Sequence, residues 1–235
     1  MPEGYGEIRL ILASASPRRR ELLASLGMAF QTHSAGADES IRAGESPVQT
    51  VVRLAILKAE VSAGAFPGRF VLGADTIVVD GDTILGKPTD PSHAFAILSQ
   101  LRGRSHSVIS AIALISPNRS RPLACALSSD VSMRGLSDEE IRQYVASGDP
   151  MDKAGAYAIQ NQTFRPAHLE SGCFCSVVGL PLGQVERLLL AGGIPAPVTA
   201  GQACPYARYS PDQCLPSAAS FEEPPGTCHG GNVSD

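Results

Sequence analysis

The segment Phe70–Pro88, FVLGADTIVVDGDTILGKP, carries the strongest structural signal in the chain. Two apolar runs, FVL and IVV, are followed by the turn residues Asp80-Gly81 and a returning run, TIL. Together they predict a β-hairpin with a polar break in its first strand. Asp75 lies in that break, and an aspartate in a buried strand is costly unless a metal, a cation or hydrogen bonds compensate it. Gly73 lets another backbone or a ligand approach closely. With Lys87 returning after the hairpin, the segment suits a metal-bound polyphosphate; a solvent-facing Asp75 is the alternative.

The composition narrows the class of protein. The chain has 235 residues, of which 43% are hydrophobic, as in globular proteins of one large domain or two small ones. No apolar run reaches the ~20 residues of a membrane helix, and the net charge of −4 argues against a general nucleic-acid binder. The N-terminal segment lacks the basic region of a signal peptide, so we expect a cytoplasmic protein without membrane or nucleic-acid partners. The six cysteines show no CxxC spacing, so we expect reduced thiols rather than a zinc site.

Two Ser-Pro pairs predict the starts of helices. Ser16-Pro17 suits the cap and first position of one helix, and Ser46-Pro47 those of a second, which carries Lys58 toward its end. Arg18–Arg20 crowd the first turn of the first helix, where the helix dipole disfavours cations. A Ser-rich turn, backbone N–H groups and arginines together favour an anion site there, the alternative being a solvated arginine face.

The order of the predicted elements indicates an α/β domain with a mixed sheet. We expect a strand at 8–13, helices at 16–26 and 46–63, the hairpin, a helix at 90–101, strands at 105–115 and 123–133, a helix at 137–148 and a last helix ending at 190. From Ile194 to Asp235, Pro, Gly, Ser and Ala dominate and the periodicity vanishes. We therefore expect one domain at 1–193 and a disordered or loosely packed tail at 194–235.

Five segments occur in the order and with the spacing of one family. They are SASPRRRELL (14–23), GADTIVVDGDTILGKP (73–88), GRSHSV (103–108), GDPMDKAGAYAIQ (148–160) and VVGLPL (177–182). Over about residues 8–193 the chain resembles the Maf family of nucleoside triphosphate pyrophosphatases. The resemblance implies an elongated α/β fold like that of inosine triphosphate pyrophosphatases, with a mixed sheet and two lobes around a central cleft.

The resemblance also implies a reaction. Members cleave the α–β phosphoanhydride of a nucleoside triphosphate, giving a monophosphate and pyrophosphate, with a divalent metal that we expect to be Mg²⁺, or else Mn²⁺. Asp75 matches the catalytic carboxylate, described as the proton acceptor. The other matching positions are Arg18, Thr76 and Gln160 for base specificity, Ser14, Arg19, Lys58 and Lys87 for phosphate binding, and Glu39 as a second carboxylate that would hold metal with Asp75. SPRR, GADT and the late Gln resemble the dTTP/UTP branch, and a homodimer is compatible with the resemblance.

Some positions depart from the family's pattern. Ser110-Ala111 stands where Thr-Gly is usual, and Asn161 replaces a Gly after Gln160. Three alternatives stay open: a 7-methyl-GTP pyrophosphatase of the same fold, a non-catalytic regulator of septum formation, and a nucleotide sensor without turnover. The intact set of Asp75, Lys58 and Lys87 favours catalysis, because a pure binder need not keep it.

Overall fold

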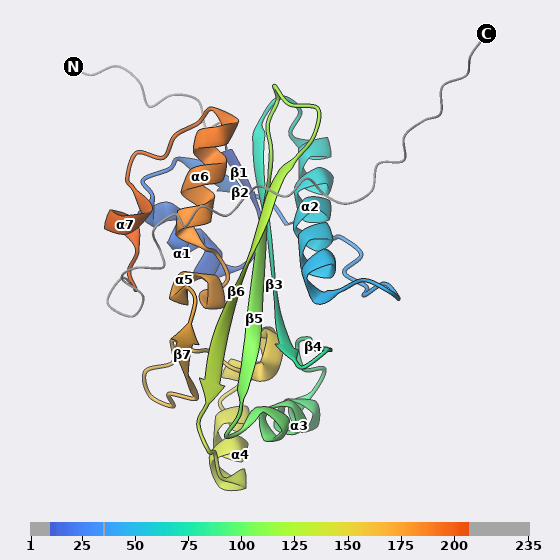
Figure 1. Ribbon diagram of the computed structural model, residues 1–235, viewed down its shortest axis with the longest axis vertical. Coiled ribbons are helices and arrows are strands. Elements are labelled where there is room, and N and C mark those ends of the chain that lie inside the picture. Colours follow the sequence, from blue (N-terminus) through green and yellow to red (C-terminus); the bar gives the residue numbers. More distant parts are fainter. Residues whose placement is uncertain (1–9, 35, 207–235) are drawn as a thin grey trace.

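Three strands of eleven residues each form the long axis of the protein (Figure 1). They are β3 (Phe70–Asp80), β5 (Ser105–Ile115) and β6 (Leu123–Met133). The computed structural model describes residues 10–34 and 36–206. β5 runs antiparallel to both β3 and β6, and β3 pairs with β5 continuously from Val71 to Val79. The mixed α/β fold predicted from the sequence is confirmed.

The other strands complete a seven-stranded mixed sheet in the order β2-β1-β3-β5-β6-β7, with β4 also on β3. They are β1 (Leu10–Ala13), β2 (Phe30–Thr32), β4 (Thr83–Leu85) and β7 (Ala167–Ser171). The pairs of β1 with β2 and with β3 are parallel, and the remaining pairs are antiparallel. The parallel strands are linked by helices, as such connections require.

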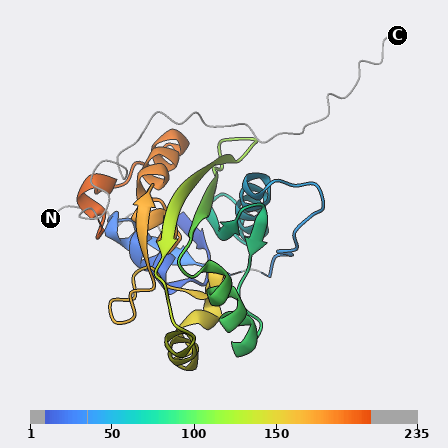
Figure 2. The same cartoon turned by 60° about the horizontal axis from the view of Figure 1, so that its bottom comes forward.

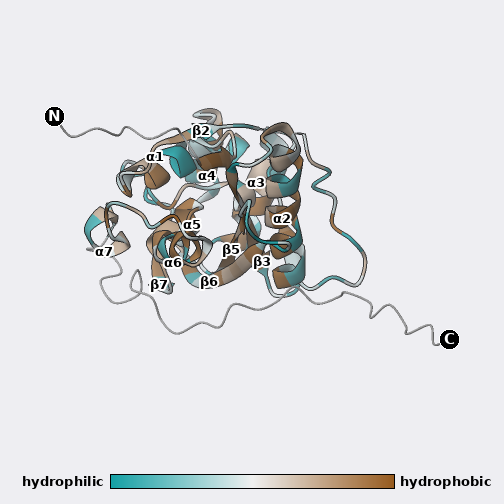
Figure 3. Cartoon of the chain, turned by 90° about the horizontal axis from the view of Figure 1, so that it is seen from above, coloured by the Kyte–Doolittle hydropathy of each residue, from teal (hydrophilic) through white to brown (hydrophobic). Residues whose placement is uncertain are grey.

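Helices cover both faces of the sheet, and each face has its own core. Figure 3 shows α2 on one side of the sheet, with α5 and α6 on the other. The helices are α1 (Pro17–Ser25), α2 (Pro47–Ala65), α3 (Pro91–Leu101), α4 (Asp138–Ala146), α5 (Phe174–Val178), α6 (Leu182–Gly192) and α7 (Ala200–Ala203), with 3₁₀ turns η1 (Asp149–Asp152) and η2 (Ala154–Ala156). Alternate residues of β1 belong to different cores. Ile11 packs on the side of α2, whereas Leu10 and Leu12 pack on the side of α1 and α6. None of the helices in the described ranges is long and apolar enough to cross a membrane.

The helices also form two groups along the strands. Figures 1 and 2 show α3, α4 and β4 at one end of β3 and β5, and α1, α2, α5 and α6 toward the other. The sequence predicted the starts of α1, α2, α3 and α4 correctly, but it did not predict α5 or α7. Ser16 and Ser46 cap α1 and α2 with their side chains, and Ser137 caps α4 in a capping box. The prediction of two lobes agrees with this arrangement.

The polar break expected in the hairpin is a gap in pairing rather than a break in the strand. On the edge of β3 away from β5, β1 pairs as far as Gly73 and β4 begins at Val78. Within the described part of the chain, no strand pairs with that edge at residues 74–77, which we call the unpaired edge. The continuous pairing with β5 keeps the strand straight, while the unpaired edge leaves room beside Asp75 and Thr76.

Gly73 explains how closely α2 packs on the sheet. A Cβ at this position would collide with the carbonyl oxygen of Ala55 and lie 2.8 Å from the amide nitrogen of Ala59. The sequence predicted the close approach of a backbone or a ligand, and the structure shows that it is the backbone of α2. This approach brings the helix, and Lys58 with it, against the strand that carries Asp75.

The sequence predicted a disordered or loosely packed tail from Ile194, but residues 194–206 pack against the rest of the domain. Ala200 and Cys204 are buried, and the Val198 amide donates to the Leu26 carbonyl over 3.1 Å. The apolar residues of this segment that pack on the core, such as Ile194, Ala196 and Ala200, are isolated from one another in the sequence, so they formed no visible periodic pattern. The rest of the predicted tail, 207–235, lies outside the described residues.

Candidate active site

A cleft with a volume of about 540 Å³ lies beside the unpaired edge of β3. Five cationic side chains and three carboxylates line it, although the whole chain has a net charge of −4. They are Arg18, Arg19, Lys58, Lys87 and Lys153, and Glu39, Asp75 and Asp152. Every site residue predicted from the sequence lies on this cleft, including Ser14, Thr76 and Gln160. A local excess of cations in an acidic protein suits an anionic ligand.

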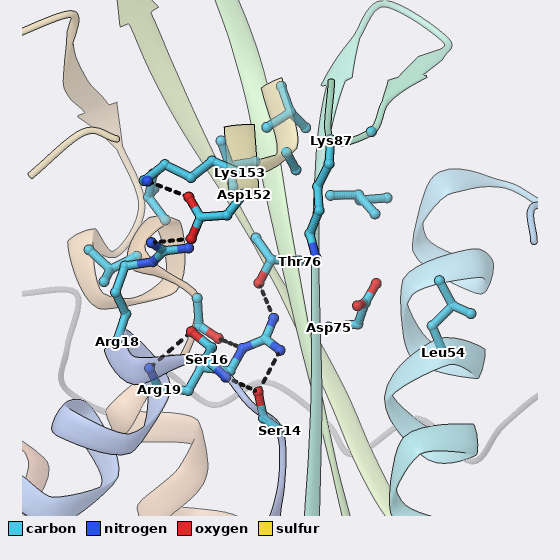
Figure 4. Close-up of a pocket in the computed structure, with 18 of the residues that line it drawn as sticks. Ser14, Ser16, Arg18, Arg19, Leu54, Asp75, Thr76, Lys87, Asp152 and Lys153 are labelled. Carbon is cyan, nitrogen blue, oxygen red and sulfur yellow. Dashed lines mark hydrogen bonds and ion pairs between the residues drawn. The ribbon is translucent and has the colours of Figure 1, made fainter. Parts of the chain in front are cut away.

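Asp75 and Lys58 form the charged pair at the centre of the cleft. Asp75 is only 6% exposed, and its Oδ1 lies 2.6 Å from Lys58 Nζ on α2. The solvent-facing alternative for Asp75 is therefore wrong. Figure 4 shows the carboxylate of Asp75 on the α2 side of β3. The ammonium supplies the compensation that a carboxylate on a buried strand requires.

Glu39 approaches the same ammonium from the loop before α2. Its Oε1 lies 3.0 Å from Lys58 Nζ, so two carboxylates converge on one cationic group. Hard oxygen donors of this kind fit Mg²⁺ or Mn²⁺, which hold few protein carboxylates and complete their shell with phosphate and water. Within residues 10–34 and 36–206 no group of three or more His, Cys, Asp or Glu side chains could hold a metal alone. A divalent cation held by Asp75 and Glu39 would therefore need further ligands besides these two carboxylates.

An ion pair fixes the loop that carries Glu39. Arg53 contacts both carboxylate oxygens of Glu45, at 2.6 and 2.7 Å, and also donates to the carbonyl oxygen of Ser40 over 3.0 Å. The hydrogen bonds from Arg53 lower the pKa of Glu45. A two-point contact of guanidinium with carboxylate restricts orientation as well as distance, so the pair holds the loop against α2.

Arg19 connects three elements on the other face of β3. Its Nε donates to the Gly179 carbonyl oxygen and its Nη1 to that of Ala74, both over 2.9 Å, and Nη2 donates to Thr76 Oγ1 over 3.0 Å. Nη1 also lies 3.4 Å from Ser14 Oγ (Figure 4). Burial lowers the pKa of the guanidinium, and the charge of Asp75 opposes this effect. Four of its five N–H groups are engaged, which leaves one for a phosphate.

The hydroxyl of Thr76 continues this network into the core. Ser110 Oγ donates to the Ser176 carbonyl oxygen over 2.7 Å and lies 2.8 Å from Thr76 Oγ1. Because the single proton of Ser110 goes to Ser176, Thr76 must donate to Ser110 while accepting from Arg19. Ser110 was noted only as a departure from the family's Thr. In the structure, it fixes the orientation of the Thr76 hydroxyl.

Two loops carry the remaining predicted residues. Lys87 follows β4, is exposed and extends toward the level of Thr76 (Figure 4). Gln160 lines the cleft half-buried, and the side chain of Asn161 holds the next turn by accepting from the amides of Thr163 and Phe164, at 3.1 and 2.8 Å. The departure at Asn161 therefore orders the loop that follows Gln160.

The sequence model of one family, described as "Maf-like protein", matches residues 9–191, which include all these cleft residues. The chain belongs to the Maf family. A dTTP/UTP pyrophosphatase of Geotalea uraniireducens (strain Rf4) is 46% identical over 180 residues, which are 77% of this chain and 93% of the relative. One of Myxococcus xanthus (strain DK1622) is 47% identical over 189 residues, 80% of this chain and 94% of the relative. The solved structure of the Staphylococcus aureus Ham1 protein aligns with a TM-score of 0.35 at 14% identity, covering 67% of this chain and 90% of that one.

This Maf protein has two further charged cleft residues that sequence reasoning did not single out. Asp152 Oδ2 lies 3.3 Å from Arg18 Nη1, and its Oδ1 contacts Lys153 Nζ. Burial alone would raise the pKa of Asp152, but Lys153 and Arg18 together lower it. Both residues belong to the segment GDPMDKAGAYAIQ, whose density of charge was the available signal. Gly155, where a Cβ would lie 2.8 Å from a methyl group of Val78, lets this segment pack on β3.

Proposed function

We propose that this Maf protein is a nucleoside triphosphate pyrophosphatase that hydrolyses the α–β phosphoanhydride of dTTP and UTP, removing unwanted nucleotides from the pool. One observation carries the proposal. The ion pair of the buried Asp75 with the half-buried Lys58 lies in a cation-rich cleft, and the sequence that builds this cleft is 46–47% identical to relatives named dTTP/UTP pyrophosphatase.

The reaction forms one phosphorus–oxygen bond and breaks another. A water oxygen attacks the α-phosphorus, the bond from this phosphorus to the α–β bridging oxygen breaks, and pyrophosphate leaves with the bridging oxygen. The nucleoside monophosphate keeps the oxygen of the water. Asp75 is the group assigned to accept the proton, and positioned general bases of this kind typically contribute about 10²–10⁴-fold.

Several cationic side chains of the cleft are assigned to the negative charges of the triphosphate. Lys58 and Lys87 are assigned to the triphosphate, whose transition state needs charge neutralisation more than covalent chemistry. Ser14 and the N-terminus of α1 add hydroxyl and backbone donors. Because Arg19 has most of its N–H groups engaged, we assign it chiefly to holding Thr76 and only secondarily to a phosphate.

Asp75 and Glu39 are the residues assigned to a divalent cation, Mg²⁺ or Mn²⁺. When bound, such an ion neutralises phosphate oxygens and lowers the pKa of its water. Lys58 already lies between the two carboxylates, so it would share them with the ion. Asp75 can thus act as a base, as a metal ligand, or as both.

Arg18, Thr76 and Gln160 are assigned to the choice of base. The side-chain amide of Gln160 can pair with the edge of a pyrimidine through one of its N–H donors and its carbonyl oxygen acceptor. We further propose that the enzyme works in the cytoplasm on free nucleotides, without a nucleic-acid or membrane partner, as a monomer or a homodimer.

The test is pyrophosphate release from a panel of dTTP, UTP, CTP, purine triphosphates and 7-methyl-GTP, with and without Mg²⁺. We expect pyrophosphate from dTTP and UTP only when metal is present. Orthophosphate as the only product would contradict the reaction, and turnover confined to 7-methyl-GTP would support the other branch of the family. No turnover of any nucleotide by a folded protein would favour a regulator or sensor.

A further inference from the structure

Two cysteines far apart in the sequence meet in the core beside the C-terminal segment, residues 194–206. Cys175 lies in α5 and is fully buried, and Cys204 follows α7 and is 7% exposed. Their Sγ atoms are 3.1 Å apart, although the residues are 29 positions apart in the chain. The sequence predicted reduced thiols, and it placed Cys204 in a disordered or loosely packed tail.

Residues before and after Cys204 in the chain make contacts that hold its sulfur atom close to that of Cys175. On one side, the amide of Ala200 donates to Glu186 Oε2 over 2.8 Å. On the other side, the ring of Tyr206 packs on that of Phe174, with centroids 4.5 Å apart. The Cys204 amide also donates to the Ala200 carbonyl oxygen over 2.9 Å. The approach of the sulfur atoms is therefore fixed by contacts that do not involve them.

We propose that Cys175 and Cys204 form a reversible disulfide that fastens the C-terminal segment to α5. The oxidant is a low-molecular-weight disulfide. The Cys204 thiolate attacks one of its sulfur atoms and releases a first small thiol, and the Cys175 thiolate then attacks Cys204 Sγ and releases a second. Two protein thiols lose two electrons and two protons, and the small disulfide becomes two thiols.

The geometry needs little change for this step. A disulfide has its sulfur atoms about 2.05 Å apart, so the pair must close by roughly 1 Å. Cys204 is the more accessible member of the pair, because it is 7% exposed whereas Cys175 is 0% exposed. Reduction by an excess of small thiol reverses the exchange.

The disulfide would also restrict the motion of a segment that lines the cleft. Two residues after Cys175, the chain begins to line the cleft with Val177, Val178 and Gly179, and the Gly179 carbonyl accepts from Arg19. A covalent link at Cys175 therefore ties α5 to the C-terminal segment without touching a residue assigned to the substrate. The expected consequence is greater thermal stability, independent of the reaction proposed above.

The test uses the full chain, incubated with oxidised glutathione or with dithiothreitol. Remaining thiols are alkylated, and the protein is digested with chymotrypsin without reduction for mass spectrometry. Chymotrypsin cleaves after Phe174, which separates Cys173 from Cys175. We expect a cross-linked peptide that joins Cys175 to Cys204, and a melting temperature higher by roughly 5–10 °C than that of the reduced protein.

Variants decide whether the pair is specific. Cys204→Ser should lose both the cross-link and the rise in melting temperature, whereas Cys125→Ser should keep both. Burial raises the pKa of the Cys125 thiol to about 12, so this cysteine is a matched control that reacts slowly. The wild-type peptide map does not depend on any variant, so a variant that fails to fold leaves the test intact.

Three results would overturn the proposal. Cys204 joined instead to Cys173, Cys214 or Cys228 would show that the contact does not select the pair. Glutathione retained on Cys204 without a cross-link would show that Cys175 cannot reach it. A cross-link that leaves the melting temperature unchanged would show that the bond fastens nothing.

Discussion

Asp75 and Thr76 are neighbours in β3, yet their side chains meet different helices. The carboxylate of Asp75 contacts Lys58 on α2, whereas the hydroxyl of Thr76 accepts from Arg19 on α1 (Figure 4). Successive residues of a strand point to opposite faces of a sheet. Because the edge at 74–77 is unpaired, one cleft reaches both faces, with the charged pair on one side and the Thr76 network on the other.

Replacing Asp75 with Asn should reduce kcat at least ~10²-fold, because the amide cannot accept the proton of the attacking water. The fold should survive, since Asn has the same shape and Lys58 keeps its contact with Glu39. Steady-state kinetics with dTTP and a thermal melt measure the two effects. Glu60 is an exposed residue on the same helix as Lys58, so Glu60→Gln is the matched control and should leave kcat unchanged. An unaltered kcat in Asp75→Asn would remove this residue from the mechanism.

Gln160→Ala should reduce kcat/KM for dTTP and UTP more than for purine triphosphates. A lost hydrogen bond to the base costs about 0.5–1.5 kcal/mol, and an unpaired buried group costs more. Lys87→Ala should weaken all nucleotides alike, because each carries the same triphosphate. The measurement is kcat/KM for dTTP, UTP, CTP and 7-methyl-GTP on both variants. Equal losses on every nucleotide for both variants would refute the assignment of Gln160 to the base.

Ser110→Ala should destabilise the protein by about 1–3 kcal/mol. It removes the partner of the Thr76 hydroxyl and the donor to the Ser176 carbonyl in a fully buried position. Urea unfolding measures the change. Ser128→Ala, an exposed serine on the neighbouring strand β6, should change stability by less than about 0.5 kcal/mol. A similar small effect in both variants would mean that the Thr76 network carries little energy.

His106 should make the protein less stable in mild acid. Burial lowers the pKa of this imidazole from 6.5 to about 4, with opposing effects from Asp80 and Glu170. Between these pH values the unfolded chain binds a proton that the folded protein does not, so stability falls as pH falls from about 6.5. At pH 5 the loss is about 2 kcal/mol.

Urea unfolding at pH 7 and pH 5 checks this effect in the wild type and in His106→Gln. The glutamine keeps a polar group near the Tyr157 hydroxyl, which lies 2.6 Å from His106 Nε2. The variant should lose less stability between the two pH values than the wild type does. If both lose the same amount, the carboxylates account for the pH dependence.

Truncation after Gly193 should lower the melting temperature by several degrees, because it removes the buried residues Ala200 and Cys204. Truncation after Tyr206 is the matched control, and we predict that residues 207–235 are dispensable. The protein truncated after Tyr206 should keep its full activity at low temperature. Equal melting temperatures for both truncations would mean that the packed segment contributes no stability.

Local sequence patterns were enough to predict the main elements, and the family resemblance identified most of the charged residues of the cleft. Ser-Pro pairs, apolar periodicity and the hairpin turn are local features, so they predicted the starts of α1 and α2 and the strands β3 and β4. The five collinear segments identified residues that all line one cleft. A short-range pattern can also indicate that Gly73 admits a close neighbour, although not which one.

How these residues are used depends on the packing of distant segments. Asp75 meets Lys58 because Gly73 lets α2 pack closely on β3, and Arg19 is occupied because Ala74, Thr76 and Gly179 surround it. The contact of Cys175 with Cys204 likewise joins segments whose sequences carry no common signal. Such contacts form only when the whole chain has folded, and none of the three is encoded in a local pattern of residues.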